Sequence, residues 1–190
     1  PPRSTLFPYT TLFRSEIPCD TVLLSVGLVP ENELSRNLGV EINPATNGPW
    51  VDSRLMTNVP GVFACGNVLH VHDLVDYVAE EARRAGACAA DWLAGSSPRK
   101  ELRLKTGSNV RYLNPAKVDP DKENKIYLRS MVVKNGAVLE ARIDGRVVKS
   151  IKKAHVQPSE MLSLTLGPKD LAEPGLLAAN QSAQVEIAII

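Results

Sequence analysis

The sequence "VFACGNVLHVHDLVDYVAEEARRAGACAADWLAG", residues 62–95, joins a short apolar run to a long helical pattern. Residues 62–65 predict a short buried strand, which the pair Gly66-Asn67 ends. From about Asp73, apolar residues recur every three or four positions, which predicts an amphipathic helix that stops at Gly95. The stretch therefore predicts a strand, a tight glycine turn and a helix in succession.

The same spacing predicts which face of this helix is buried. The expected buried stripe consists mostly of small residues, which allow close packing: Leu74, Val75, Val78, Ala79, Ala82, Ala85, Gly86, Ala89, Ala90 and Leu93. The opposite face is expected to carry the charged residues Asp76, Glu80, Glu81, Arg83, Arg84 and Asp91.

Upstream, the near-continuous apolar run 21–26 predicts a strand buried on both faces of an α/β sheet. A short helical or turn segment follows, with Leu34 and Leu38 expected to face inward and Gly39 to cap its end. The pair Asn47-Gly48 is the tightest hairpin signal of this region.

After residue 110 the pattern changes from helical to alternating. Six short antiparallel strands are predicted, at 110–118, 125–133, 137–143, 146–156, 161–166 and 183–190. Asn135-Gly136 and Asp144-Gly145 predict two-residue hairpin turns. This half is expected to form a small all-β, sandwich-like domain, with an immunoglobulin-like arrangement as one form. It shows no catalytic constellation, and His155 is expected to be a surface or strand residue.

Charge divides the chain at the same place. Residues 16–98 carry a net charge of −7 and residues 99–190 a net charge of +6, with all ten lysines of the chain in the second part. This shift predicts a domain boundary near residue 98. The basic residues are spread along the strands rather than clustered, which favours a solvated surface over a nucleic-acid site.

Other classes of protein are disfavoured by composition. The apolar runs are too short to span a bilayer. Cys19, Cys65 and Cys88 are isolated, so they predict neither a disulfide framework nor a metal site, and they fit a reducing cytoplasm. All three cysteines are interpreted as packing residues.

Two motifs, in their order along the sequence, resemble those of a known family. "DTVLLSVGLVPEN" (20–32) and "VDSRLMTNVPGVFACGN" (51–67), followed by the Ala/Gly-rich helix, resemble the C-terminal part of two-dinucleotide-binding-domain flavoproteins. These are the FAD- and NAD(P)-dependent pyridine nucleotide-disulfide oxidoreductases, and the resemblance covers residues 17–95. It implies an α/β fragment, residues 16–98, followed by the β domain, residues 99–190. The appended β domain also resembles a bacterial subgroup of NAD(P)/FAD-dependent oxidoreductases.

The resemblance implies a set of FAD contacts. Gly66-Asn67 stands where the family has Gly-Asp, whose carboxylate lies on the ribityl chain, and Asn67 keeps an acceptor oxygen without the charge. Asp76, Tyr77 and Val78 fall near the helix start that faces the flavin. Gly27 and Pro30 match a turn of the family, with Glu31 inserted before Asn32.

His70 and His72, beside Asp73, occupy the region where this class places residues over the flavin. They are candidate catalytic residues, as proton donors or substrate ligands, or they simply line a loop. The sequence predicts no metal site.

The first fifteen residues, "PPRSTLFPYTTLFRS", fit neither a secretory signal nor a mitochondrial presequence. Their back-translation resembles the adapter oligonucleotide of short-read DNA sequencing, so residues 1–15 are interpreted as a non-native, disordered segment. The chain also lacks any G-x-G-x-x-G motif. We therefore expect a truncated C-terminal portion that is inactive by itself and binds FAD weakly.

The function expected from these features is FAD-dependent oxidation–reduction with NAD(P)H, in a cytoplasmic protein. Its partner would be a small-molecule substrate or a redox subunit, with no nucleic acid and no membrane span, and oligomer formation is left open. The alternative is a non-catalytic interaction module whose β domain docks a partner subunit.

Overall fold

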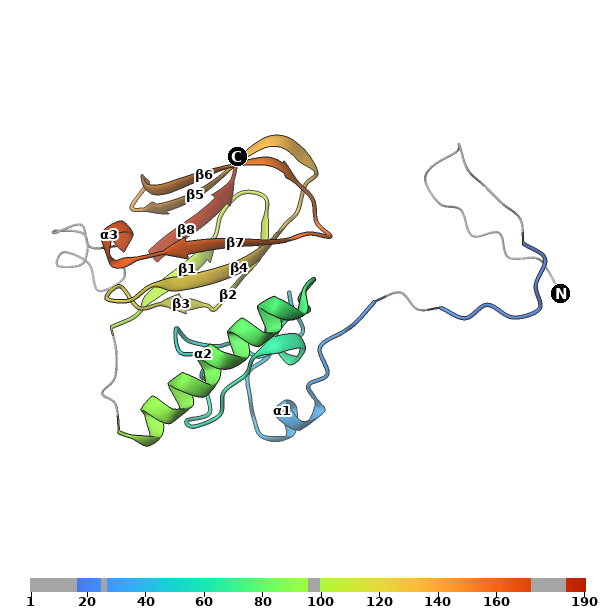
Figure 1. Ribbon diagram of the computed structural model, residues 1–190, viewed down its shortest axis with the longest axis horizontal. Helices are drawn as coiled ribbons and strands as arrows, with labels where there is room; N and C mark the ends of the chain where they lie inside the picture. Colours follow the sequence, from blue (N-terminus) through green and yellow to red (C-terminus); the bar gives the residue numbers. More distant parts are fainter. Residues whose placement is uncertain (1–16, 25–26, 96–99, 172–183) are drawn as a thin grey trace.

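The computed structural model describes residues 17–24, 27–95, 100–171 and 184–190. The adapter-like segment 1–15 lies outside the described residues. Two sheets and one long helix dominate the described part, and Figure 1 shows the helix lying beneath the sheets, with residues 17–24 extending away from both. The fold is therefore mixed α/β followed by a β region. No helix in these four ranges is both long and apolar enough to cross a membrane.

The β region consists of a five-stranded sheet in the order β3-β1-β8-β5-β6 and a three-stranded sheet in the order β2-β4-β7. The strands are β1 (Leu102–Thr106), β2 (Val110–Asn114), β3 (Lys117–Val118), β4 (Asn124–Ser130), β5 (Lys134–Ile143), β6 (Arg146–Val156), β7 (Met161–Leu166) and β8 (Gln184–Ile189). A short helix, α3 (Pro168–Leu171), follows β7. Both sheets contribute to one core, for example through Leu128 of β4 and Ile187 of β8, so the two sheets pack face to face.

Three details of this region differ from the predicted pattern. β1 was not predicted, and it pairs in parallel with β8 rather than antiparallel. The predicted strand 110–118 is divided into β2 and β3 at Pro115. Asn135-Gly136 lies inside β5, where Asn135 pairs with His155, so the hairpin predicted there is wrong.

The other hairpin signal is confirmed. Asp144 and Gly145 connect β5 to β6 with φ values of 48° and 81°. Two successive positive φ angles define the turn type that matches the twist of antiparallel strands.

Helix α2 (Val75–Leu93) confirms the predicted long helix, but only Ala85 of the predicted stripe is buried. Glu81 and Ala85 are its buried residues, whereas Ala82 and Gly86 are exposed and Leu93 is 79% exposed. Ala85 packs into a small apolar cluster with Leu55 and Leu69, whereas Glu81 meets the polar side chain of Asn114 in the β region.

The segment before α2 has little regular structure. Residues 62–65 form an isolated bridge, Met56 with Phe63, instead of the predicted strand. The described part of the predicted strand 21–26 is not a strand either, and Leu23 is 95% exposed because no other strand pairs with it in the described chain. Cys19 in the same segment is exposed, so its predicted packing role is wrong.

Helix α1 (Glu33–Asn37) lies where a short helical segment was predicted. Gly39, at φ +79°, follows its end as the expected left-handed cap, and the N–H of Val40 bonds to the carbonyl of Ser35. Leu34 and Leu38 are 85% and 56% exposed, so their predicted inward orientation is wrong.

The turn at Asn47 is confirmed by an antiparallel bridge between Ile42 and Pro49. Gly48 lies directly against the backbone of Leu69. A Cβ at this position would lie 1.8 Å from the carbonyl oxygen of Leu69, so only glycine allows this approach.

Candidate functional site

Three buried side chains meet where α2 faces the β region, and we call His70, His72 and Glu81 the His–Glu cluster. Nε2 of His70 lies 3.1 Å from Oε1 of Glu81, and Nε2 of His72 lies 3.0 Å from Oε2. The exposed fractions of His70, His72 and Glu81 are 1%, 8% and 1%. The residues come from the loop before α2 and from its second turn, so folding of this segment brings them together.

Two neutral donors complete the environment of the Glu81 carboxylate. The backbone N–H of Gly66 donates to Oε2 over 2.6 Å, and the side-chain amide of Asn114 donates to Oε1 over 3.2 Å. Burial raises the pKa of Glu81, but the hydrogen bonds from His70 and His72 outweigh it and lower that pKa to about 2. Glu81 is therefore a carboxylate at neutral pH.

The ionised state of Glu81 defines the protonation of both rings. A carboxylate only accepts hydrogen bonds, so Nε2 of His70 and Nε2 of His72 each carry a proton. Nδ1 of His70 lies 3.3 Å from the hydroxyl of Tyr112. Nδ1 of His72 is buried and makes no hydrogen bond to any described residue. Burial lowers the pKa of His70, and Glu81 opposes this shift.

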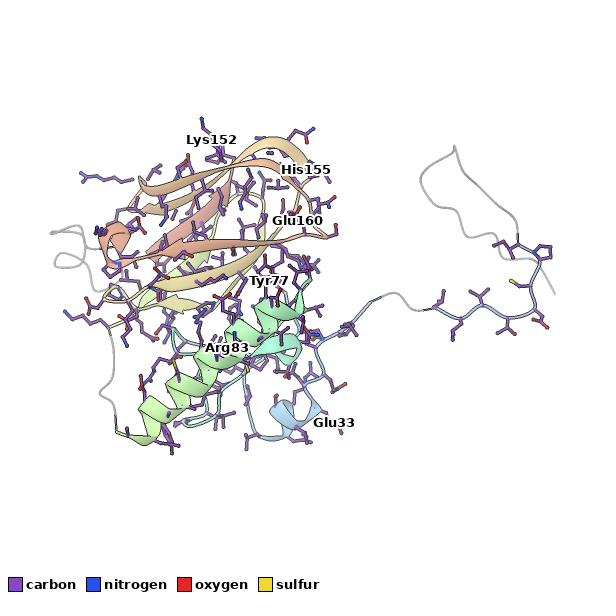
Figure 2. All side chains as sticks on the ribbon, viewed as in Figure 1. Glu33, Tyr77, Arg83, Lys152, His155 and Glu160 are labelled. Atoms are coloured by element: carbon purple, nitrogen blue, oxygen red, sulfur yellow. The ribbon has the colours of Figure 1, made fainter. Side chains whose placement is uncertain are left out.

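Aromatic rings surround the cluster. The ring centroids of His70 and His72 are 4.2 Å apart, and the ring of Tyr127 lies edge-on to His72 at 5.1 Å. Tyr77 lies 5.6 Å from Tyr127. Figure 2 shows Tyr77 at the end of α2 next to the sheets, whereas Glu33 lies on the far side of α2 from the sheets. These rings exclude water from the two histidines.

Ion pairs between the acidic and basic parts of the chain lie around this centre. Arg129 of β4 bonds to Asp73 over 2.5 Å and also donates to the carbonyl of Val71. The other oxygen of Asp73 accepts from the backbone N–H of Met161. Lys125 pairs with Glu80 on α2. The loop before α2 is therefore held to β4 and β7.

The Gly66-Asn67 turn is directly bonded to the cluster. Gly66 is buried with φ +70°, and a Cβ there would lie 3.2 Å from the side chain of Val78. Asn67 is exposed, and its Oδ1 accepts from the backbone N–H of His72 over 3.2 Å. The turn thus has the left-handed glycine and the exposed amide that a backbone contact to a cofactor needs.

The first turn of α2 begins without a side-chain cap and carries the acid Asp76. No side chain caps its N-terminus, and Asp76 and Tyr77 lie in the first turn with Val78 behind them. Asp76 is exposed, and Tyr77 and Val78 are half-buried. Uncapped N–H groups at a helix start stabilise a nearby negative charge.

The structure thus brings together His70, His72, Gly66, Asn67 and Val78, which the sequence had singled out. It adds Glu81, Tyr112 and Asn114, which the sequence had not. No local signal distinguishes Glu81 from the neighbouring Glu80, and Tyr112 and Asn114 come from the part of the chain in which no site was expected. A separate pocket, lined by Leu34, Val40, Phe63 and Val68 among others, contains none of these eight residues.

Comparisons with known proteins give a family match for the part of the chain that contains the Gly66-Asn67 turn. Residues 9–89 match the family described as pyridine nucleotide-disulphide oxidoreductase. The match covers 81 of the 190 residues and supports the pyridine nucleotide-disulfide oxidoreductase class for this segment. No solved structure matches the chain.

Curated relatives point the same way. A ferredoxin–NADP reductase of Picrophilus torridus is 33% identical over 57 residues, 30% of this chain and 17% of that protein. A CoA-dependent NAD(P)H sulfur oxidoreductase of Pyrococcus abyssi is 30% identical over 95 residues, 50% of this chain and 19% of that protein. A nitric oxide reductase FlRd-NAD(+) reductase of Salmonella heidelberg is 32% identical over 92 residues, 48% of this chain and 24% of that protein. The match thus spans a quarter or less of each relative.

Proposed function

We propose that this chain serves a FAD-dependent oxidoreductase that uses NAD(P)H and transfers hydride between nicotinamide and flavin. The observation that carries the proposal is the buried, left-handed Gly66 followed by the exposed Asn67, which precede an uncapped helix in a segment of this class. Bound FAD would supply the hydride-accepting ring. We further propose a cytoplasmic location and a small-molecule or redox-protein partner.

Each residue of the turn has a separate part in this proposal. Gly66 supplies the left-handed φ of the turn that leaves Asn67 exposed, and the Asn67 amide would bond a ribityl hydroxyl of FAD. The first turn of α2, at Asp76, Tyr77 and Val78, would lie near the flavin, and its backbone N–H groups would stabilise negative charge there. A proton-donating role for His70 and His72 stays a prediction, because both rings are buried against Glu81.

Replacement of Asn67 by Leu tests the proposal in a full-length homologue with the same Gly-Asn turn. We expect the flavin content of the purified protein to fall, because Leu cannot bond a ribityl hydroxyl. Asn37→Leu is the matched control, since Asn37 is exposed at the end of α1, away from the turn. Unchanged flavin with loss of subunit association would instead favour the interaction module.

A further inference from the structure

We propose that His70, His72 and Glu81 form a binding site for a divalent transition-metal ion of the Zn²⁺ type. This departs from the sequence, whose spacing predicted no metal site. The three residues each offer one ligand atom, and these atoms all lie within 4.8 Å of one another. All three side chains are at least nine-tenths buried.

The distances suit ligation by one ion. Ligand atoms about 2.0–2.2 Å from a common ion are separated by about 3.0–3.5 Å when they subtend angles of about 90–110° at it. The observed separations are 3.1 Å for His70 Nε2 to Glu81 Oε1 and 3.0 Å for His72 Nε2 to Glu81 Oε2. The ligand atoms as a set lie within 4.8 Å of one another, which is wider than about 3.0–3.5 Å, so the side chains must draw together around an ion. Two imidazoles and one carboxylate are a common ligand set for such ions.

The charge of the cluster also calls for a cation. Glu81 is 1% exposed and carries a negative charge, and the hydrogen bonds that it accepts come from two imidazoles, one amide and one backbone N–H. No Lys or Arg side chain donates to it in the described residues. A divalent ion placed between the imidazoles and Glu81 would balance the charge of this buried carboxylate.

The surrounding groups already form an outer shell. A carboxylate has about four lone-pair positions. Gly66 and Asn114 use two of these, so the positions that face the imidazoles remain for an ion. Tyr112 orients the His70 ring through Nδ1, as outer-shell partners of metal-bound histidines do.

One ring nitrogen of the His–Glu cluster has no hydrogen-bond partner among the described residues. Nδ1 of His72 is buried and unpartnered among the described residues. The hydrogen bonds among the described residues therefore leave the lone pair of this nitrogen unused.

The experiment uses the complete 190-residue chain with a purification tag free of histidine, treated with chelator and then dialysed. Zn²⁺ is titrated into it by calorimetry, and Co²⁺ by visible absorption. We expect one equivalent of each to bind, with the d–d spectrum of nitrogen and oxygen ligands. No saturable binding would overturn the proposal, and so would a near-ultraviolet thiolate band, which would assign the ion to a cysteine.

Two variants locate the ion. His72→Gln should weaken Zn²⁺ binding at least about 100-fold, because it removes a ligand, and Tyr112→Phe about tenfold, as an outer-shell change. His155→Ala is the matched control: His155 is exposed and lies far from α2 (Figure 2), so its removal should leave the affinity unchanged. Equal affinity in all three variants would overturn the assignment.

A measurement on the unmodified chain avoids variants that fail to fold. Long-range ¹H–¹⁵N spectra resolve the ring nitrogens of the three histidines. We expect Nε2 of His70 and His72 to shift on addition of one equivalent of Zn²⁺ and the nitrogens of His155 to stay in place. Shifts at His155 alone would contradict the site. None of these readouts needs flavin, so the metal site and the flavin proposal can fail separately.

Discussion

Glu81 is one of the residues that join the two parts of the chain, and it makes the most hydrogen bonds described at the candidate site. Its two oxygens accept from the glycine turn, from both histidines of the loop, and from Asn114 of β2. Four donors to one buried carboxylate link a turn, a loop, a helix and a strand. A substitution of Glu81 should therefore destabilise the turn, the loop, the helix and the strand together.

The first prediction concerns acid stability. The folded-state pKa of Glu81 is about 2, below the value of about 4.3 for an unfolded glutamate. The folded state thus binds fewer protons, so the stabilisation is complete above about pH 4.3 and is lost as the pH falls to about 2. Its size is on the order of 3 kcal/mol. Urea unfolding between pH 2 and neutrality measures it.

Glu81→Gln should flatten this pH dependence and lower the free energy of unfolding at neutral pH. Glu160→Gln is the control, because Glu160 is an exposed acid of the turn before β7 (Figure 2). A profile of Glu81→Gln that matches the unmodified chain would contradict the role given to the carboxylate.

The second prediction compares two glycines. Gly48→Ala should destabilise the chain by about 1–3 kcal/mol, because its methyl group would overlap the Leu69 carbonyl oxygen. Gly86→Ala should stabilise it by about 0.5–1 kcal/mol, because Gly86 lies within α2 with open space around it. Thermal unfolding of both variants checks the signs, and two shifts of the same sign would refute the comparison.

At the scale of elements, α2 is held at its N-terminal end by the β region and is exposed at its C-terminal end. Asp73, just before the helix, bonds to Arg129 of β4 and to the N–H of Met161 in β7. Arg84 reaches the carbonyl of Lys125 one turn further along than Glu81. Beyond this point Trp92 and Leu93 are exposed. The helix is thus anchored over its first half.

The third prediction tests this anchor. Asp73→Ala should speed amide hydrogen exchange at Met161 and in the first turn of α2. It should cost about 1–3 kcal/mol, because it removes the ion pair with Arg129 and leaves the backbone N–H of Met161 without its acceptor. Asp76→Ala is the control, since Asp76 is an exposed acid of the same turn. Equal exchange in the two variants would show that Asp73 is not the anchor.

Periodicity predicted the existence of α2 and of most β strands because both depend on local repeats of apolar residues. The buried face of α2 could not be predicted in this way, because it depends on contacts that are distant in the sequence. Asn114 is more than thirty residues from Glu81, and Tyr112 is more than forty residues from His70. β1 was missed because its five residues, "LRLKT", are short and half charged. The hairpin turn at Asp144-Gly145 was predicted correctly, because its two successive positive φ angles favour this residue pair.

At the scale of the whole molecule, the uneven charge of the sequence explains part of the contact between its two halves. Acidic residues of the first part, Asp73 and Glu80, pair with Arg129 and Lys125 of the second. These basic residues are therefore not only a solvated surface. The segment 17–24, in contrast, projects from the rest (Figure 1).

The fourth prediction follows from that segment. Val22, Leu23 and Leu24 are 63%, 95% and 70% exposed, and such a contiguous apolar stretch favours association. We expect the chain to self-associate as its concentration rises, and a variant with Leu23→Asp and Leu24→Asp to remain monomeric. Analytical ultracentrifugation measures both. Identical sedimentation of the two proteins over the concentration range would rule out this segment as the cause.

The parallel pairing of β1 with β8 has a consequence for biosynthesis. β8 lies between β1 and β5 in the five-stranded sheet, so β1 and β5 have no hydrogen-bonded contact with each other. A ribosome delivers β1 about eighty residues before β8, which at about 5–20 residues per second leaves several seconds. During that interval β1 and β5 lack the strand that lies between them, so their unpaired edges are open to pairing with other chains.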